Sequence, residues 1–204
     1  MTKGSLFIVA APSGAGKTSL VNALVAQQAD IRLSVSHTTR LPREGEVDGQ
    51  DYFFLSQDSF AQMRDAGAFL ESATVFDNSY GTSSESVLAQ LQQGFDVILE
   101  IDWQGAEQVR HNFPDSTSIF ILPPSKTALE QRLRGRGQDN DDIIARRMRD
   151  AENEISHYVE FDYLIVNDQF DVALTNLVAI IIARRHSIAV QKQVNLELLT
   201  ELLA

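Results

Sequence analysis

The sequence predicts an α/β fold in which helices flank a parallel sheet. Short apolar runs rich in β-branched residues recur along the chain, and amphipathic segments with a helical period separate them. With 204 residues, of which 44% are hydrophobic, the chain has the size and composition of one globular domain. The crossovers between successive parallel strands are expected to be right-handed.

Four of the apolar runs contain few polar positions and are therefore expected to be buried strands of this sheet. They cover residues 5–11, 96–101, 117–122 and 163–166. The amphipathic segments between them predict helices over residues 17–28, 104–112 and 126–133, and one long final helix from residue 171 to about residue 191.

Two stretches interrupt the alternation of strands and helices. Extended segments at residues 33–39, 52–55 and 69–76 predict a small, more antiparallel insert with its own turns. Residues 134–160 begin with a glycine-containing turn and continue as a charged helix, a candidate moving lid. We expect a single domain over residues 4–190. It divides into a core (about 4–32, 94–133 and 161–190), an insert (about 33–93) and a lid (about 134–160), and a helical tail follows (191–204).

Composition narrows the range of partners. The formal charge is −11, and long-range repulsion disfavours a general binder of the nucleic-acid backbone, so we expect no nucleic-acid partner. The absence of cysteine excludes disulfides and cysteine-ligated metals. The longest wholly apolar run, Leu177 to Ala183, is far shorter than the roughly 20 residues that span a bilayer. Because the start of the chain also lacks the pattern of a signal peptide, we expect a cytoplasmic protein without a membrane partner.

A phosphate-binding loop is predicted directly after the first strand. Residues 11–18 read A-P-S-G-A-G-K-T and match the pattern G-x-x-x-x-G-K-[ST], except that Ala11 replaces the first glycine. In such a loop the backbone N–H groups surround a phosphate, the lysine reaches the β- and γ-phosphate oxygens, and the hydroxyl binds Mg²⁺. The alternative is an ordinary glycine turn with a surface lysine. The predicted nucleotide-binding residues are Ala11, Pro12, Ser13, Gly14, Ala15, Gly16, Lys17 and Thr18, with Thr18 as the metal ligand.

The loop indicates a nucleotide but not a reaction, and the remaining motifs are more specific. Residues 36–43 read S-H-T-T-R-L-P-R, residues 80–82 read Y-G-T, and residues 102–105 read D-W-Q-G. Together with the loop, these motifs make the chain similar to guanylate kinases of the bacterial type over about residues 4–190. The resemblance implies a P-loop parallel sheet flanked by helices, with a mobile GMP-binding insert and a helical lid. It also implies Mg²⁺-dependent transfer of the γ-phosphoryl group of ATP to GMP, and to dGMP, in purine nucleotide metabolism.

The resemblance assigns Arg40, Arg43, Tyr52 and Tyr80 to the phosphate of GMP. This agrees with their chemistry, since two arginines three residues apart in an extended segment can fork onto one phosphate, and tyrosine hydroxyls add neutral donors. The alternatives are a solvated pair of loop charges for the arginines and core packing for Tyr52.

Ser36, Glu71 and Thr82 match the positions that read guanine. A carboxylate can accept from guanine N1–H and N2–H₂ together, whereas adenine has no N1 proton and would leave the carboxylate unpaired. An exposed strand carboxylate is the alternative for Glu71. Asp102 is assigned to the GMP site and, with Glu100, to the water shell of the metal, and a helix-capping role is its rival.

Three arginines in the lid or just before it match positions near the ATP phosphates of the family. Arg136 and Arg147 are expected to act with Lys17 on the transferring group, while Arg132 and Asn167 are expected to bind ATP. A loop-capping role is the alternative for Asn167. Because the acceptor oxygen is already an anion, the reaction needs alignment and charge neutralisation rather than a strong base.

Two other functions remain open at this point. One is a related kinase that acts on a ribose bisphosphate or another nucleoside monophosphate, against which Glu71 and Thr82 argue. The other is a non-catalytic guanylate kinase-like module that binds phosphopeptides, against which the intact loop and the arginines argue. The leucine-rich segment 196–204 is expected to serve in packing or self-association, so a homo-oligomer is one expected state.

Overall fold

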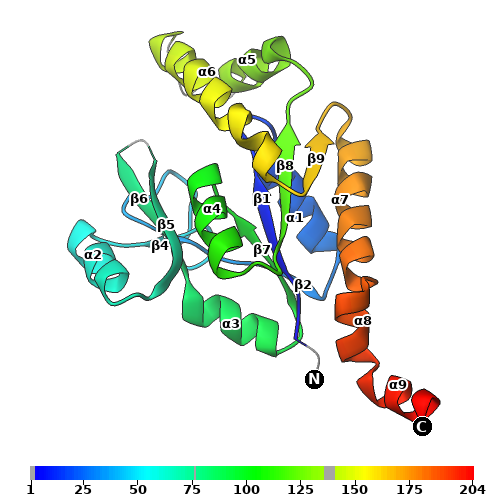
Figure 1. The fold of residues 1–204 in the computed structure, drawn as a ribbon. Helices are drawn as coiled ribbons and strands as arrows, with labels where there is room; N and C mark the ends of the chain where they lie inside the picture. Colours follow the sequence, from blue (N-terminus) through cyan, green and yellow to red (C-terminus); the bar gives the residue numbers. More distant parts are fainter. Residues whose placement is uncertain (1–2, 76, 136–140) are drawn as a thin grey trace.

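The computed structural model describes residues 3–75, 77–135 and 141–204. Its central layer is a five-stranded parallel sheet with the strand order β2-β7-β1-β8-β9 (Figure 1). The strands are β1 (Leu6–Ala10), β2 (Ile31–Leu33), β7 (Asp96–Glu100), β8 (Thr117–Leu122) and β9 (Tyr163–Val166). The predicted α/β fold with a parallel sheet flanked by helices is confirmed.

Alternate residues of each strand face opposite sides of the sheet, and each side has its own apolar core. Phe7 and Val9 pack with α1 (Lys17–Gln27) and α7 (Phe170–Arg185). Leu6 and Ile8 pack with α3 (Ser84–Gln92) and α4 (Trp103–Asn112) on the other face. The strands β1, β7 and β8 are therefore buried on both sides, which explains why apolar residues dominate them. The prediction that residues 163–166 form a buried strand was wrong in part, because β9 lies at the edge of the sheet, where Ile165 is buried and Tyr163, Leu164 and Val166 are exposed.

A second, four-stranded sheet has the order β4-β3-β6-β5. Its strands are β3 (His37–Thr38), β4 (Phe53–Phe54), β5 (Phe69–Val75) and β6 (Asn78–Ser83), and α2 (Gln57–Asp65) packs beside it. Both pairings of β6 are antiparallel, as predicted for the insert, whereas β3 and β4 pair in parallel. The extended segment expected over 33–39 is divided, because Leu33 pairs with Ile98 in the central sheet.

The second sheet is fastened to α4. The side-chain amide of Gln108 accepts from the N–H of Ser72 at 3.2 Å and donates to the carbonyl of Ser72 at 2.9 Å, so it extends the edge of β5. This edge of the sheet thereby has hydrogen-bond partners on the α4 side.

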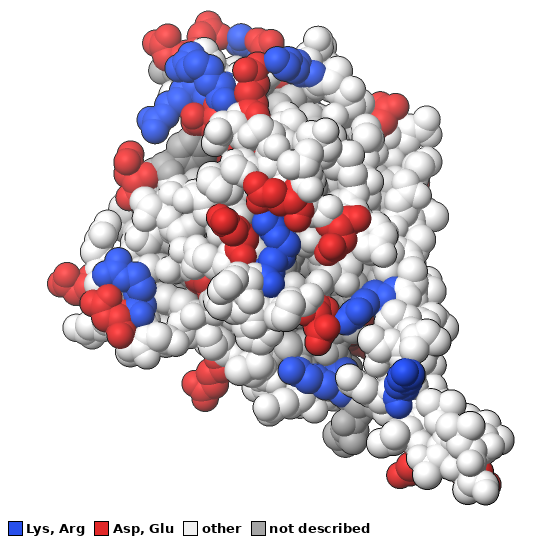
Figure 2. All heavy atoms as spheres, viewed as in Figure 1, with Lys and Arg blue, Asp and Glu red and all other residues white. Residues whose placement is uncertain are grey.

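The predicted lid contains α6 (Asp141–Ser156), which packs against α5 (Lys126–Arg134) through Leu129, Leu133 and Ala151. A short 3₁₀ helix, η1 (His157–Glu160), follows α6. The region of α5 and α6 carries side chains of both charges (Figure 2). Lys126 of α5 forms an ion pair with Glu152 of α6 at 2.6 Å. The glycine-containing turn predicted at the start of the lid lies partly outside the described residues.

The prediction of a single final helix from residue 171 to about residue 191 was wrong. The chain instead forms α7, α8 (Ile188–Val194) and α9 (Leu196–Leu203). The hydroxyl of Ser187 caps α8 by accepting from the N–H of Val190, and this cap starts a new helix after α7 ends at Arg185. Within the described residues, no individual helix combines the length and apolarity of a membrane span; α7 and α8 do so only when joined across a 56° bend.

Candidate active site

The loop between β1 and α1 has the backbone of an anion-binding turn. Gly16 caps the start of α1 with a φ of 91°, a left-handed conformation that side chains disfavour. A Cβ on Gly16 would also lie 2.4 Å from the amide nitrogen of Asn167. The first N–H groups of α1 therefore open onto the loop without an intervening side chain, as a bound phosphate requires.

Asn167 and Arg132 hold the loop in place from behind. The buried amide of Asn167 donates to the carbonyl of Ala15 at 2.8 Å. The guanidinium of Arg132 donates to the same carbonyl at 3.3 Å and to the carbonyl of Asn167 at 2.9 Å. These contacts give both side chains a role in shaping the loop, and their expected contact with ATP stays a prediction.

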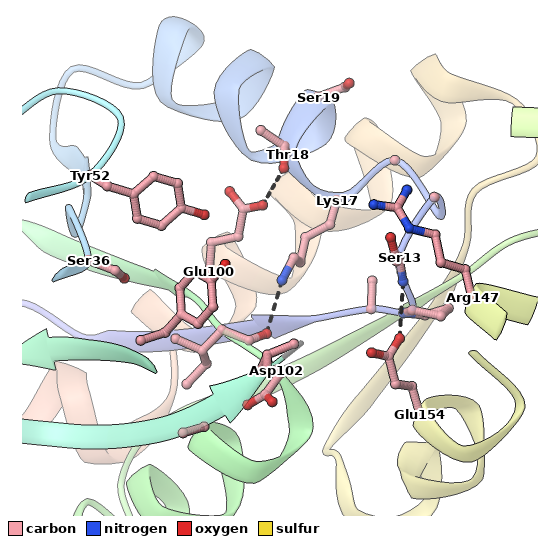
Figure 3. Close-up of a pocket in the computed structure, with 18 of the residues that line it drawn as sticks. Ser13, Lys17, Thr18, Ser19, Ser36, Tyr52, Glu100, Asp102, Arg147 and Glu154 are labelled. Atoms are coloured by element: carbon pink, nitrogen blue, oxygen red, sulfur yellow. Dashed lines mark hydrogen bonds between the residues drawn. The ribbon is translucent and has the colours of Figure 1, made fainter. Parts of the chain in front are cut away.

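A cavity of about 290 Å³ opens on the loop (Figure 3). It brings together residues from the loop, the insert, the end of β7 and α6, which are far apart in the sequence. Of the predicted site residues, those that line it are Ala11, Pro12, Ser13, Gly14, Gly16, Lys17, Thr18, Ser36, Arg43, Tyr52, Glu71, Tyr80, Asp102 and Arg147. Ala15, Arg40, Thr82, Arg132 and Asn167 lie outside this lining, and Arg136 lies outside the described residues.

Lys17 and Thr18 point from the loop toward the end of β7 (Figure 3). The ammonium of Lys17 donates to the carbonyl of Ile101 at 3.0 Å, and the hydroxyl of Thr18 donates to the carboxylate of Glu100. The described residues contain no cluster of three or more side chains suited to enclose a metal. Mg²⁺ needs no such cluster, because it keeps water and phosphate ligands, so the Thr18 hydroxyl beside Glu100 fits this ion, with Asp102 on the wall of the same cavity.

Asp102 caps the helix that follows β7. Its carboxylate accepts from the N–H of Gly105 at 2.9 Å and from the amide of Gln104 at 3.1 Å. The capping role that the sequence left open is therefore confirmed. Asp102 also lines the cavity, so capping the helix does not exclude its predicted roles toward the substrate and the water shell of the metal.

Glu71 lies on β5 at the inner end of the cavity and is only 4% exposed. The hydroxyl of Thr82 donates to the Glu71 carboxylate at 2.6 Å, and the hydroxyl of Ser36 lies 3.5 Å from that of Thr82. Burial raises the pKa of Glu71 to about 7, mainly because a charged carboxylate loses its hydration. The alternative of an exposed strand carboxylate was wrong, and Thr82 acts here through Glu71.

The raised pKa of Glu71 predicts a pH-dependent cost to stability. Because the pKa is about 7 in the folded chain against 4.5 for free glutamate, the folded state binds the proton more tightly. The stability that the folded state gains from binding this proton is fully present below about pH 4.5 and is lost as the pH rises through about 7. Between pH 5 and pH 8 we expect the free energy of unfolding of the parent to decrease more than that of the Glu71→Gln variant. The difference between the two decreases should be about 2 to 3 kcal/mol.

Urea titrations of both proteins at several pH values measure this difference. The exposed Glu85→Gln variant is the control and should follow the parent. Parallel pH profiles for the parent and the Glu71→Gln variant would contradict the prediction.

The two arginines predicted to bind phosphate have different surroundings. Arg40 forms a two-pronged ion pair with Glu46, at 2.7 and 2.9 Å, which lowers the pKa of that carboxyl. Arg43 is exposed and lines the cavity. The hydroxyl end of Tyr52 points into the cavity (Figure 3), and its ring lies 6.0 Å from that of Tyr80. Tyr52 is therefore more than a core residue.

Glu154 of α6 is a site residue that the sequence analysis missed. Its carboxylate accepts from the loop N–H of Ser13 at 3.1 Å, and burial raises its pKa (Figure 3). Glu154 lies two helical turns after Arg147, and both line the cavity. This i, i+7 spacing is a signal that could have drawn attention to it.

Comparison with known proteins places this site in a family. Residues 3–184 match the family model for guanylate kinase. A guanylate kinase from Nitrosococcus oceani is 65% identical over 182 residues, which cover 89% of this chain and 90% of the relative. The guanylate kinase of Escherichia coli strain K12 is 56% identical over 206 residues, which cover 100% of both chains.

A solved structure agrees with these sequence matches. The crystal structure of guanylate kinase from Anaplasma phagocytophilum superposes with a TM-score of 0.81 at 32% sequence identity, over 98% of this chain and 95% of that one. The chain therefore belongs to the guanylate kinase family and is a nucleoside monophosphate kinase.

Proposed function

We propose that the protein transfers the γ-phosphoryl group of ATP to GMP, giving ADP and GDP, and that it also accepts dGMP. One observation carries this proposal: the phosphate loop and the buried Glu71 line the same cavity. A donor triphosphate held by the loop and a guanine held at Glu71 would both have their phosphates inside this cavity. Transfer between them would then require no rearrangement of the central sheet.

The donor side is supplied by the loop. The N–H groups of the loop and of the first turn of α1 bind the β-phosphate, and Lys17 reaches toward the β- and γ-phosphate oxygens by exchanging the carbonyl of Ile101 for them. Mg²⁺, when bound beside Thr18, neutralises charge on the phosphates. Glu100, next to Thr18, and Asp102, on the wall of the same cavity, would accept hydrogen bonds from the water ligands of this ion.

The acceptor side is supplied by the insert. Ionised Glu71 accepts from guanine N1–H and N2–H₂, while the hydroxyls of Ser36 and Thr82 lie beside it to serve guanine O6. Arg43, Tyr52 and Tyr80 donate to the phosphate. Arg40 joins them by exchanging Glu46 for the phosphate, since both anions fit the same planar fork.

Transfer itself depends on alignment and on neutralising charge. The GMP phosphate oxygen attacks as an anion, so no side chain has to remove a proton from it. Lys17 and Arg147 line the cavity on the donor side and stabilise the moving group together with Arg136. Closure of the cavity excludes water, which would otherwise accept the phosphoryl group.

Product analysis tests the proposed reaction. The purified chain is mixed with ATP and Mg²⁺ and with GMP, dGMP, AMP, UMP or a ribose bisphosphate in turn, and the products are separated by chromatography. We expect ADP together with GDP or dGDP. A clear preference for a non-guanine acceptor, or binding of a phosphopeptide without turnover, would contradict the proposal.

Replacement of Glu154 by glutamine is predicted to strengthen ATP binding. Glutamine can still accept from the Ser13 N–H, but it removes a negative charge from the edge of the phosphate site. We expect the Kd for ATP, measured by calorimetry at pH 8 without GMP, to fall about threefold to tenfold. The Glu152→Gln variant changes an exposed acid of the same helix and should leave the Kd unaltered. An unchanged or higher Kd for the Glu154→Gln variant would contradict this reasoning.

The proposal extends to the cellular location of the protein and to its self-association. The cytoplasm is the proposed location and is checked by fractionation of the producing cell. Self-association through α9 stays a prediction, supported by the exposure of Leu196, Leu198, Leu202 and Leu203, and sedimentation measures it.

A further inference from the structure

Gly105 occupies an unfavourable position for a glycine. It is the third residue of α4, after the cap at Asp102, and its N–H donates to the Asp102 carboxylate at 2.9 Å. Its backbone is an ordinary part of the helix, without the positive φ that favours glycine elsewhere in the chain. Glycine within a helix lowers stability relative to alanine, so helix formation alone does not explain this residue.

The neighbour of Gly105 does explain it. A Cβ at this position would lie 2.5 Å from one carboxylate oxygen of Glu71 and 3.1 Å from its carboxyl carbon. Contacts below 3.0 Å do not persist, so one of the two groups would have to shift.

Neither group can shift freely. The other carboxylate oxygen of Glu71 accepts from Thr82 at 2.6 Å, and the side chain is buried. The α4 backbone at Gly105 is held by the Asp102 cap and by its packing in the core through Ala106 and Val109. An added methyl group would therefore push the Glu71 carboxylate off its present position and away from Thr82.

We infer that Gly105 is a specificity-determining residue, because the missing side chain leaves the space in which Glu71 presents its carboxylate to the acceptor base. The inference rests on the proposed function, since it takes Glu71 as the residue that reads guanine. Gly105 itself makes no hydrogen bond to the base and acts only by positioning Glu71.

The Gly105→Ala variant tests this inference. We expect the KM and the Kd for GMP to rise at least about tenfold, because a carboxylate displaced from its partners no longer pairs with guanine. The preference for GMP over AMP should fall by the same factor. The KM for ATP and the kcat at saturating GMP should stay within about twofold, because the loop is untouched. Glu107→Ala, an exposed change on the same helix, is the control and should match the parent in all five quantities.

A double-mutant cycle separates action through Glu71 from a general disturbance of α4. The Glu71→Ala variant has no carboxylate to displace, so adding Gly105→Ala to it should change kcat/KM for GMP by less than about twofold. A full additional loss in that background would overturn the inference. Circular dichroism and urea unfolding confirm that each variant folds.

The outcomes also distinguish this inference from the proposed function. If the parent chain does not bind or phosphorylate GMP, the proposed function fails. If the parent does both and the Gly105→Ala variant is indistinguishable from it, the proposed function stands and the role of Gly105 is refuted.

Discussion

The Lys17→Ala variant is expected to lose phosphoryl transfer by at least about 10³-fold in kcat, since it removes a positioned cation from the charge that develops on the transferring group. The ammonium of Lys17 is already directed into the cavity, where its hydrogen bond to the carbonyl of Ile101 orients it. Little reorganisation is needed when the triphosphate binds, which is why its loss should be costly.

A coupled assay with ATP, Mg²⁺ and GMP measures the effect of this change. The control is Lys192→Ala, which removes an exposed lysine of α8 and should keep kcat within about twofold. The free energy of unfolding should be nearly the same for both variants. Turnover near that of the parent in the Lys17→Ala variant would refute the role of this lysine.

The Glu71→Gln variant is expected to lose at least about 10²-fold in kcat/KM for GMP, since glutamine presents one acceptor oxygen and an amide donor where guanine offers only donors. The buried position of Glu71 makes this mismatch costly, because water cannot enter to satisfy the unpaired N–H groups. The ratio of kcat/KM for GMP to that for AMP should fall as well.

Steady-state kinetics with both nucleotides measure the loss of preference. The Glu85→Gln variant, which changes an exposed acid of α3, should keep the parent's ratio. An unchanged preference for GMP in the Glu71→Gln variant would show that another residue reads the base. The stability measurement described above is independent of this result, because it concerns the free energy of burying Glu71 and not the substrate.

The parts of the fold that the sequence predicted are those with strong local signals. The runs of β-branched residues predicted four strands, and the G-K-T residues at the end of the loop predicted that α1 begins there. The break after Arg185 was missed because the apolar pattern continues across it. The C-cap of α7 at His186 and the Ser187 hydroxyl that caps α8 separate the two helices.

The parts of the site that the sequence did not predict depend on contacts between distant segments. Glu154 is 141 residues from Ser13, and its spacing from Arg147 places it on the same face of α6 but does not indicate that its carboxylate reaches the loop. Gly105 was noticed only as part of a motif, because its relation to Glu71 appears only when α4 packs beside β5. Arg40 and Glu46 are close in sequence, but their ion pair was not predicted because Arg40 was assigned to the phosphate of GMP.

The attachment of β5 to α4 limits how the insert can open. Gln108 holds both backbone groups of Ser72, and the Glu71 carboxylate fills the space over Gly105, so separating β5 from α4 would break all of these contacts together. Arg40 and Arg43 lie between β3 and β4, and among the described residues no hydrogen bond joins either of these strands to α4. When the acceptor enters or leaves, we therefore expect the part of the insert that binds its phosphate to swing, while the part that binds its base stays in place.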